Sequence, residues 1–547
     1  MMLKKVLSLS LALALGVASA APQLGRQLPA DTLFYGHLPS QWQLLMLQSD
    51  RDPAPLQEQF QRLRQQLLSL DSLPSLEKLR LPPALLPLLR NFAAQNNGPL
   101  ELLIRENRDG LYLGLTLEHK DPKRFAALLD DFAAVIKSKR EGDDLKGELK
   151  VNTDRTCYQF NPDSGAVLLD FNCQGEWQPA AELPLAQEAT RVDDKELLLW
   201  WSNRDNRLFQ SRNDRNAKLD KFMGRFGAAQ LRYSQDKELT LSLLNANPDS
   251  SPRWPQVSLP ADFPVTEQLE MAVGFRLPTA DQWQQLAPEF YGQLSQSLEK
   301  SGIAPADWSA ATAGDWALIS DRNGVFLLQP AANTAALDRL LDQLVAKNYL
   351  SRESLGGGLQ HLHIQWGRFL PADQALALNL MFPSHLYYRD GDGHRLWADL
   401  PQILQERKQL KFTKKLGDYF GGEPALLVAG LQLPQLARDS YHLRLKWLRL
   451  WSDLGTQPAA LAELPTAATL KLPERSPLRA RLQRDENGGS YHLSLKLPNG
   501  ITDTLALYRS NAFMTGMAAA IVLPAYQQYV EKSKAKAAAL QAQSAEK

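Results

Sequence analysis

Residues 98–117 read GPLELLIRENRDGLYLGLTL, and residues 121–139 read DPKRFAALLDDFAAVIKSK. In the first segment, two runs of strand-forming residues flank a short turn that is rich in Asn, Asp and Gly, which is the pattern of a β-hairpin. In the second segment, apolar residues recur at intervals of three and four, which is the pattern of an amphipathic helix. The whole stretch therefore predicts a hairpin followed by a helix.

The same order of elements recurs further along the chain. Residues 314–330, GDWALISDRNGVFLLQP, again predict a hairpin, and residues 333–349, NTAALDRLLDQLVAKNY, again predict an amphipathic helix. Shorter echoes keep the same order in the two halves of the chain. They pair LPADTLFYGHL from Leu28 with LPADFPVTEQLEMAVGF from Leu259, and KFMGRFGAAQLRYS from Lys221 with KLGDYFGGEPALLVAG from Lys415.

These repeats predict two tandem modules, at 21–250 and 255–440. The boundary is NANPDSSPRWPQVSLP at 245–260, where Pro, Ser and Asn interrupt both helical and strand patterns. Short turns such as 321–324 join neighbouring strands directly, which favours antiparallel sheets and disfavours a doubly wound parallel fold. We therefore expect an α+β fold, in which helices pack on one face of each antiparallel sheet.

A C-terminal extension at 441–509 follows the second module. It begins with a predicted amphipathic helix and continues into residues 492–497, which alternate as a strand does. The extension either completes the sheet of the second module or forms a small third unit. The apolar stripe of the helix consists of Leu443, Trp447, Leu450, Trp451 and Leu454, with Arg444, Lys446 and Arg449 beside it.

Those three basic residues beside two tryptophans suit an anionic lipid headgroup or an acidic partner. A surface helix that turns its basic residues to water is the simpler interpretation of the same pattern.

The opening LPADT, which precedes an apolar run, supplies a first resemblance. It is similar to the start of exported bacterial proteins that carry an uncharacterised and often duplicated domain. The resemblance extends over the two predicted modules and implies no known activity.

The N-terminus has the pattern of a secretory signal peptide. Lys4 and Lys5 precede the apolar run VLSLSLALALGV, which ends at the small residues Ala18, Ser19 and Ala20. The alternative, a membrane anchor, needs about 20 apolar residues, and this run is shorter. We therefore predict a signal peptide at 1–20 and a periplasmic location.

Length and charge restrict the function classes. The chain has 547 residues, with 61 Lys and Arg against 60 Asp and Glu, which gives a formal net charge of +1. This length is sufficient for roughly two or three hydrophobic cores. A nearly neutral body has no overall positive field to attract a phosphate backbone, so we expect no nucleic-acid partner.

The two cysteines lie symmetrically about Gly165 in TCYQFNPDSGAVLLDFNC. Two strands joined by a turn at 161–165 bring Cys157 and Cys173 opposite each other. In an oxidising periplasm this arrangement predicts a disulfide across the hairpin. Two buried free thiols are the alternative, and a metal site is disfavoured because neither cysteine has another cysteine or a histidine at ligand spacing.

Two segments carry potential metal ligands. His361 and His363 in LQHLHIQW point to the same side of a strand, as two metal ligands do, but the pattern identifies no third ligand. Asp390, Asp392 and His394 in RDGDGHRLW lack the closing glutamate of a calcium loop and match a hairpin turn instead. We therefore predict a structural or solvent-facing histidine pair, a turn, and no metal or cofactor.

Motifs of known catalytic sites are absent from the sequence. The chain has no GxSxG elbow, no HExxH motif, and no glycine-rich loop that ends in GK followed by Ser or Thr. The pattern therefore favours a protein that is not an enzyme, although residues that converge only in three dimensions leave no such motif.

The C-terminal end has the strongest single signal. Residues 510–530 contain no charged residue and are followed by Glu531 and a lysine cluster. A helix of this length spans a hydrocarbon core, and the lysines favour a cytoplasmic end, as in a type I anchor. We predict docking to a membrane or a partner through 510–547, by Phe513, Met517, Ile521, Val522, Leu523, Pro524, Tyr526, Tyr529, Lys532, Lys534 and Lys536.

Within this segment, AAAIVLPAYQQYVEKSKAKAA resembles the proline-kinked part of the first helix of type IV pilins, a family of secreted filament subunits. Pro524 matches the kinking proline, and Ala525, Tyr526 and Tyr529 match its neighbours. The glycine for processing and the glutamate for assembly have no counterpart, and the body precedes the helix instead of following it. The resemblance therefore implies a helix that associates, and neither processing nor filament assembly carries over.

Three functional hypotheses follow. The first is a non-catalytic periplasmic envelope protein that binds a protein partner and docks to the membrane or the partner through its C-terminal helix. The second is a periplasmic carrier or chaperone for an apolar ligand, which a large apolar pocket favours. The third is an enzyme without a recognisable motif, which a cleft with clustered His and carboxylate groups favours.

Overall fold

The fold is known from a computed structural model. It describes residues 24, 28–29, 31–39, 53–69, 99–105, 110–117, 120–151, 154–171, 173, 192, 196–203, 226–245, 255–259, 261–266, 269–286, 288–321, 324–330, 334–365, 384–391, 393–407, 414–420, 425–452, 461–485 and 490–509.

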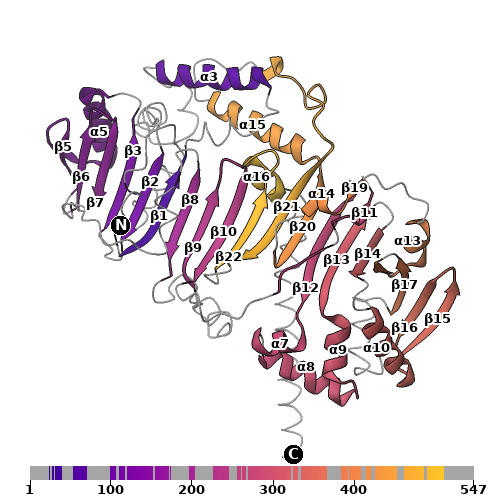
Figure 1. The fold of residues 1–547 in the computed structure, drawn as a ribbon. Helices are drawn as coiled ribbons and strands as arrows, with labels where there is room; N and C mark the ends of the chain where they lie inside the picture. Colours follow the sequence, from indigo (N-terminus) through magenta and orange to yellow (C-terminus); the bar gives the residue numbers. More distant parts are fainter. Residues whose placement is uncertain are drawn as a thin grey trace, which may run out of the picture.

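One antiparallel sheet of 20 strands runs through the described part of the chain (Figure 1). The pairings place the first ten strands in the order β4 (Lys139–Gly142), β5 (Lys146–Val151), β6 (Asp154–Asn161), β7 (Ala166–Phe171), β3 (Leu111–Thr116), β2 (Leu100–Arg105), β1 (Thr32–Leu38), β8 (Leu197–Ser202), β9 (Phe226–Tyr233) and β10 (Glu238–Asn245).

The sheet continues from β10 into the second ten strands. Their order is β22 (Tyr491–Lys496), β21 (Arg475–Arg484), β20 (Leu427–Pro434), β12 (Met271–Leu277), β13 (Gly314–Asp321), β14 (Gly324–Pro330), β18 (His394–Ala398), β17 (His385–Gly391), β16 (Leu359–Ile364) and β15 (Leu350–Gly356). A separate small sheet pairs β11 (Pro264–Val265) with β19 (Lys414–Lys415).

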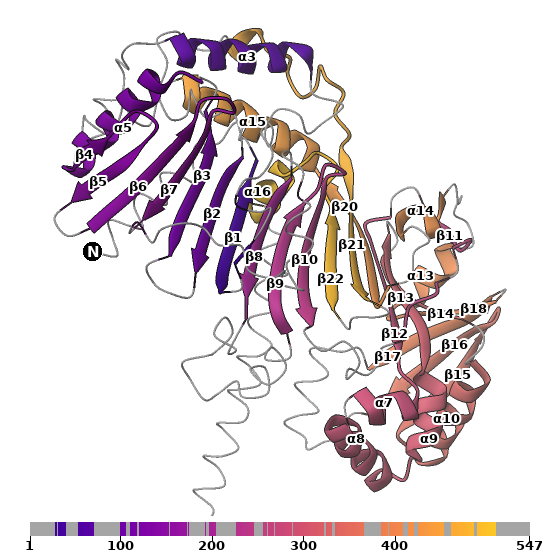
Figure 2. The ribbon, with the colours of Figure 1, turned by 60° about the vertical axis from the view of Figure 1, so that its left-hand side comes forward.

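The helices of the described residues pack against this sheet or against one another (Figures 1 and 2). They are α3 (Ala54–Ser69), α5 (Pro122–Ile136), α7 (Ala280–Leu286), α8 (Pro288–Lys300), α9 (Pro305–Thr312), α10 (Thr334–Ala346), α13 (Pro401–Glu406), α14 (Gly417–Phe420), α15 (Leu436–Ser452) and α16 (Thr502–Arg509), with a 3-10 helix at Leu461–Glu463. The expectation of an antiparallel α+β fold is confirmed at this level.

The two groups of ten strands, which we call the two halves, meet where β10 pairs with β22, and we call this strand pair the seam. The strand order is the same in both halves when each is followed outward from the seam. The counterparts are β10 and β22, β9 and β21, β8 and β20, β1 and β12, β2 and β13, β3 and β14, β7 and β18, β6 and β17, β5 and β16, and β4 and β15. The strands of the extension, β21 and β22, therefore complete the sheet, which was one of the two alternatives. The echo between Lys221 and Lys415 is wrong, because it aligns β9 with β20 whereas β20 occupies the position of β8.

The register repeats as well as the order. Tyr158 lies opposite Leu169 in the first half, and Tyr388 lies opposite Trp397 in the second, and both tyrosines are buried. At the outer edge, Arg140 of β4 pairs with an aspartate of α5, and Arg352 of β15 pairs with one of α10. These two ion pairs occupy equivalent positions, because each arginine lies opposite a buried leucine of the next strand.

Helices α5 and α10 form because their sequences separate an apolar stripe from a polar face. Asp121 caps α5 by accepting a hydrogen bond from the Lys123 backbone N–H at 3.0 Å, and Pro122 starts the helix with a suitable φ. The buried stripe contains Phe125, Leu128 and Leu129 in α5, and Leu337, Leu340 and Leu341 in α10. Each such side chain contributes about 1.5–3 kcal/mol on burial.

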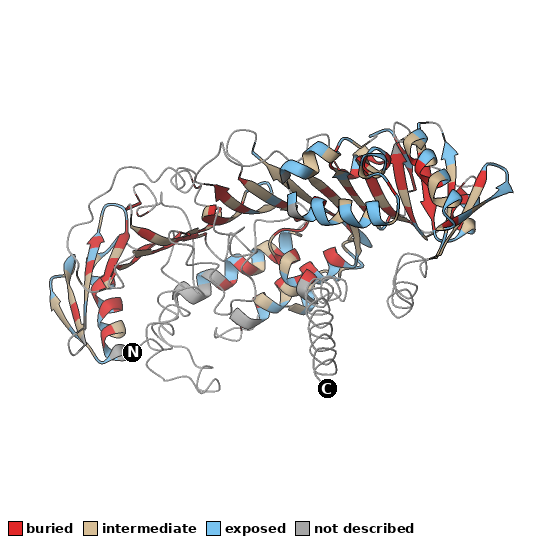
Figure 3. Ribbon diagram, turned by 90° about the horizontal axis from the view of Figure 1, so that it is seen from below, coloured by how far each residue is buried: buried red, intermediate tan, exposed pale blue. Residues whose placement is uncertain are grey.

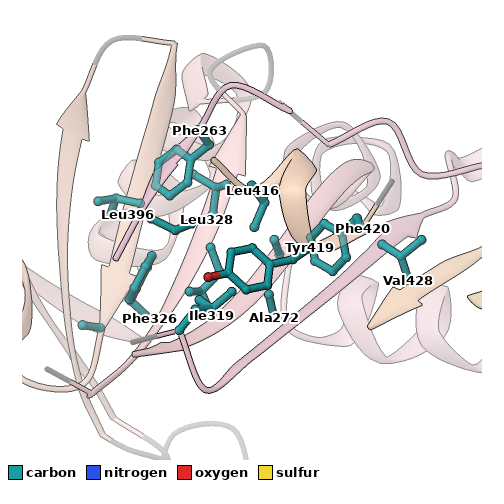
Figure 4. Close-up of a cluster of buried hydrophobic side chains, with 14 of the residues drawn as sticks. Phe263, Ala272, Ile319, Phe326, Leu328, Leu396, Leu416, Tyr419, Phe420 and Val428 are labelled. Carbon is teal, nitrogen blue, oxygen red and sulfur yellow. The ribbon is translucent and has the colours of Figure 1, made fainter. Parts of the chain in front are cut away.

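We expected helices on one face of each sheet, and this expectation is wrong for the second half. There, α10 covers Trp397 on one face, while α13 and α14 cover a second cluster of buried side chains on the opposite face (Figure 4). Strand β13 alternates Trp316 toward the first cluster and Ala317 toward the second, so it is apolar on both sides. Figure 3 shows the resulting distribution, with buried residues along the strands and exposed residues on the outward sides of the helices.

Candidate functional site

The predicted docking residues lie outside the described residues. All eleven, from Phe513 to Lys536, follow Arg509, the last residue of α16. Residues 1–20 lie outside them too, so the signal peptide and the attachment helix both stay predictions. The described residues instead include the helices that directly precede the C-terminal segment, which we call its base.

That base consists of α15 and α16, which pack against each other on one face of the sheet (Figure 2). Helix α3 contacts α15 from the outer side, and its Leu56 and Phe60 are buried. Leu436 of α15 and Ala506 of α16 share a core cluster with Leu239 and Leu495 from the seam strands. The C-terminal segment therefore starts from an element that is fixed to the centre of the sheet.

Helix α15 buries a different face from the one that its sequence predicted. The buried residues include Ala437, Tyr441, Arg444 and Leu448, whereas Leu443 and Trp447 are only partly buried. Arg444 is 3% exposed, so the expectation that it lies on the basic surface beside the stripe is wrong. Its burial has a physical reason in a buried carboxylate nearby, that of Asp503.

Asp503 is the centre of a buried polar network between α15 and α16. Its carboxylate accepts hydrogen bonds from the backbone N–H of Asn499 at 2.8 Å and from the Asn499 side-chain amide at 3.1 Å. Next to it, the hydroxyls of Ser440 and Thr502 share a hydrogen bond. Burial raises the pKa of Asp503 to about 6, although these hydrogen bonds and the charge of Arg444 favour the ionised form.

A small pocket opens on the outer side of this base. Its volume is about 230 Å³, and its walls come from α15 and Ala506 of α16. This volume is below the range of about 300–1,000 Å³ that small-molecule sites occupy. The pocket is therefore smaller than a typical small-molecule site. Its lining residues are Asp439, His442, Leu443, Lys446 and Ala506.

An apolar row crosses the middle of the sheet on the face that carries α16. Six leucines lie in direct cross-strand register from β8 to β20, and none of them is buried. The two at the seam are the most exposed, with Leu241 at 41% and Leu493 at 43%. Five inter-strand steps give the row a length of about 24 Å. In order along the row they are Leu199, Leu231, Leu241, Leu493, Leu482 and Leu427.

The predicted disulfide is present. Cys157 and Cys173 are bonded, with their Cα atoms 5.0 Å apart, and the turn between the strands closes at Gly165, whose φ of 76° favours glycine. Glu148 lies beside the two sulfur atoms, but it pairs with Lys150 and Arg155. Hydrogen bonds from these two cations lower the pKa of Glu148.

The predicted histidine pair lies on an open face of β16 and gains a third member. His385 of β17 lies directly opposite His363, and its Nδ1 is 2.9 Å from Nε2 of His361. The ring of His385 is nearly parallel to the rings of both histidines of β16. Burial and the two neighbouring imidazoles lower the pKa of His385.

The predicted turn after β17 is present, because Gly391 pairs with His394 of β18. Asp390 accepts hydrogen bonds from Arg395, and His394 packs edge-on against Phe263. Asp392 lies outside the described residues.

Two buried arginines were missed by sequence reasoning. Arg395 is 2% exposed and donates to both Asp338 and Asp390, while Arg407 pairs with the buried Asp321. Burial lowers the pKa of Arg407 to about 10. The sequence signal was weak, because the partners come from different elements. An arginine inside an apolar strand such as HRLWA was the one available sign.

Comparisons with known proteins found no match. No family model matches the chain, and neither the curated proteins nor the solved structures include one that is similar to it. Among the helices that the structure describes, none is both long and apolar enough to cross a membrane.

Proposed function

We propose that this chain is a non-catalytic envelope protein that binds an amphipathic helix of a partner protein along its leucine row. The row itself carries the proposal, because a contiguous apolar surface that stays accessible to solvent, with its two central leucines exposed, marks an interaction site. A row of about 24 Å matches a helix of roughly 16 residues at 1.5 Å per residue. The face already accepts helices of this kind, since α16 packs on Leu239 and Leu495 directly beside the row.

The C-terminal segment has the second role in this proposal. Residues 510–547 attach the protein to the inner membrane or to the partner, from the base formed by α15 and α16. The support is the position of that base, because Arg509 ends a helix that is held to the seam by buried contacts. The signal peptide at 1–20 places the body in the periplasm.

Photo-crosslinking from the row tests the proposal. A photoreactive amino acid at position 493 of the full chain is expected to give a protein adduct whose mapped peptide is an amphipathic helix. Leu355 is the matched control, because it is 46% exposed but lies on β15, outside the row. Equal protein adducts from positions 493 and 355 would contradict the proposal.

A periplasmic carrier of an apolar ligand is the second candidate, and the same row favours it. A lipid chain along the leucines would give lipid adducts at position 493 in place of a protein adduct. Mass spectrometry of the crosslinked protein separates the two candidates. Fractionation of the full chain and of a chain that ends at Arg509 tests attachment to the membrane, which fails if both stay soluble in the periplasm. Co-purification from the same two chains tests attachment to the partner, which fails if both retain the partner equally.

A further inference from the structure

The histidine cluster of the second half occupies a position where the first half has a network of ion pairs. Because the register repeats, Glu353, His361, His363 and His385 correspond to Glu141, Glu148, Lys150 and Arg155. In the first half, Lys150 pairs with both glutamates, and Arg155 pairs with Glu148. In the second half, imidazoles replace both basic side chains and one of the two glutamates, and Glu353 remains beside them.

From this geometry we infer a binding site for a divalent transition-metal ion, with His361 and His385 as its ligands. Nε2 of His361 and Nδ1 of His385 face each other at 2.9 Å. Two imidazole nitrogens at about 2.0–2.1 Å from one metal ion are about 2.9 Å apart at a right angle, and about 3.3 Å apart in a tetrahedron. The two nitrogens therefore have the spacing of neighbouring ligands. Without a metal ion they share a hydrogen bond and point at each other, so both rings must rotate before their lone pairs meet at one ion.

Glu353 supplies the outer partner that such a ligand needs. Its Oε2 is 3.7 Å from Nδ1 of His361, on the opposite side of the ring from Nε2. At this distance no hydrogen bond joins them, but the negative charge of the carboxylate favours a proton on Nδ1, which leaves the lone pair of Nε2 for the metal ion. Glu353 lies opposite His361 in the strand register, so its approach to the ring is built into the sheet.

His363 completes the site from the same strand face. Its ring stacks on that of His385 with centroids 4.5 Å apart, so a rotation of this partly exposed side chain makes it the third nitrogen ligand. Arg389, the next basic residue on this face of β17, donates to the carbonyl oxygens of Gly357 and Leu404 instead of to the cluster. The cluster therefore holds imidazoles and one carboxylate, a ligand set for which Cu²⁺ has the highest affinity of the divalent first-row ions.

The histidine cluster brings two ligand atoms together, and the group of described residues that brings three together does not fit a metal ion. Glu148, Cys157 and Cys173 lie within 4.8 Å of one another, but the two sulfur atoms are joined in a disulfide. Lys150 and Arg155 already neutralise Glu148.

Metal titration of the untagged, chelator-washed full chain tests the inference. CuCl₂ and ZnCl₂ alone are the probes, with calorimetry for affinity and electron paramagnetic resonance for bound Cu²⁺. We expect one saturable site, tighter for Cu²⁺, with resonance splitting from at least two nitrogens. His361→Gln and His385→Gln are each expected to weaken Cu²⁺ binding about 100-fold or more, and Glu353→Gln by about 10-fold.

His442→Gln is the matched control, because His442 is a partly buried histidine on α15 and is expected to leave binding unchanged. His385 is exposed and Glu353 is 70% exposed, so these variants are expected to keep the wild-type melting temperature. The inference is overturned if the wild-type chain shows no saturable site, or if the His361 and His385 variants bind Cu²⁺ as the wild type does.

Discussion

Leu241 of β10 lies directly opposite Leu493 of β22, in the strand pair that joins the two halves of the sheet. Each of these strands is the last of its half, and the two halves meet through equivalent strands in antiparallel order. The seam therefore satisfies backbone groups that would otherwise be the open edges of two ten-stranded sheets.

The seam predicts which truncations the protein tolerates. A chain that ends at Arg509 keeps β21 and β22 and is expected to elute as the full chain does and to melt at a similar temperature. A chain that ends at Ser452 loses both strands and leaves β10 and β20 as exposed edges, so aggregation is expected. Size-exclusion chromatography of the two chains checks this. A soluble, cooperatively melting chain that ends at Ser452 would show that the seam is dispensable.

The same substitution at two aspartates of α10 is expected to change the free energy of unfolding by very different amounts. Asp342 is 71% exposed and makes one contact, with Arg352, so Asp342→Asn is expected to change the free energy of unfolding by less than about 1 kcal/mol. Asp338 instead receives two hydrogen bonds from Arg395, which is 2% exposed. Asp338→Asn leaves that buried charge with Asp390 alone, and a loss of about 2 kcal/mol or more is expected.

Urea denaturation of the two α10 variants measures the difference. Asp130→Asn is a third comparison, because Asp130 is the counterpart of Asp342 in the first half and is 57% exposed. Its effect is expected to match that of Asp342→Asn and to disappear in high salt. Equal losses for Asp338→Asn and Asp342→Asn would contradict the assignment of Arg395 as a buried partner.

Local patterns predicted the repeated unit, because its hairpin and the helix that follows are formed by residues close together in the chain. The hairpin and helix predicted from Gly98 appear as β2, β3 and α5, and those predicted from Gly314 appear as β13, β14 and α10. The apolar stripes of both helices are buried, since a period of three and four fixes the face that meets the sheet.

Long-range partners escaped the same reasoning. In the sequence of α15 alone, Arg444 has the position of a surface residue. Its buried partner Asp503 comes from a different helix, α16. His385 becomes a neighbour of His361 only through the register of β16 and β17, two strands that no short turn joins, since the two histidines are 24 residues apart in the chain. The seam between β10 and β22 likewise joins strands that are far apart in the chain, and no local pattern encodes such a pairing.

The disulfide predicts a moderate and specific contribution to stability. A loop of about 15 residues contributes roughly 3 kcal/mol when it is closed by a disulfide, so Cys157→Ser with Cys173→Ser is expected to lower the free energy of unfolding by about 2–4 kcal/mol. The first-half core, which contains Leu149 and Tyr158, lies on the opposite face of these strands and remains in place. Thermal melts of the wild type with and without reductant, beside the double variant, measure this. If reductant leaves the melting temperature of the wild type unchanged but the double variant melts at a lower temperature, the loss comes from poor packing of the serines and not from the missing disulfide.

Asp503 predicts a pH dependence whose sign is opposite to that of a salt-bridged aspartate. Its pKa is about 6 in the folded chain, against an ordinary value of 3.8, so the folded state binds the proton more tightly. Stability from this group is therefore full below about pH 4 and is lost as the pH rises through 6, by on the order of 3 kcal/mol. Asp503→Asn keeps an acceptor for the Asn499 backbone N–H and removes the titration. As the pH rises from 4 to 7, the variant is expected to become more stable relative to the wild type. Denaturation at both pH values measures this. If the difference in stability is the same at both, Asp503 has the ordinary pKa of an aspartate.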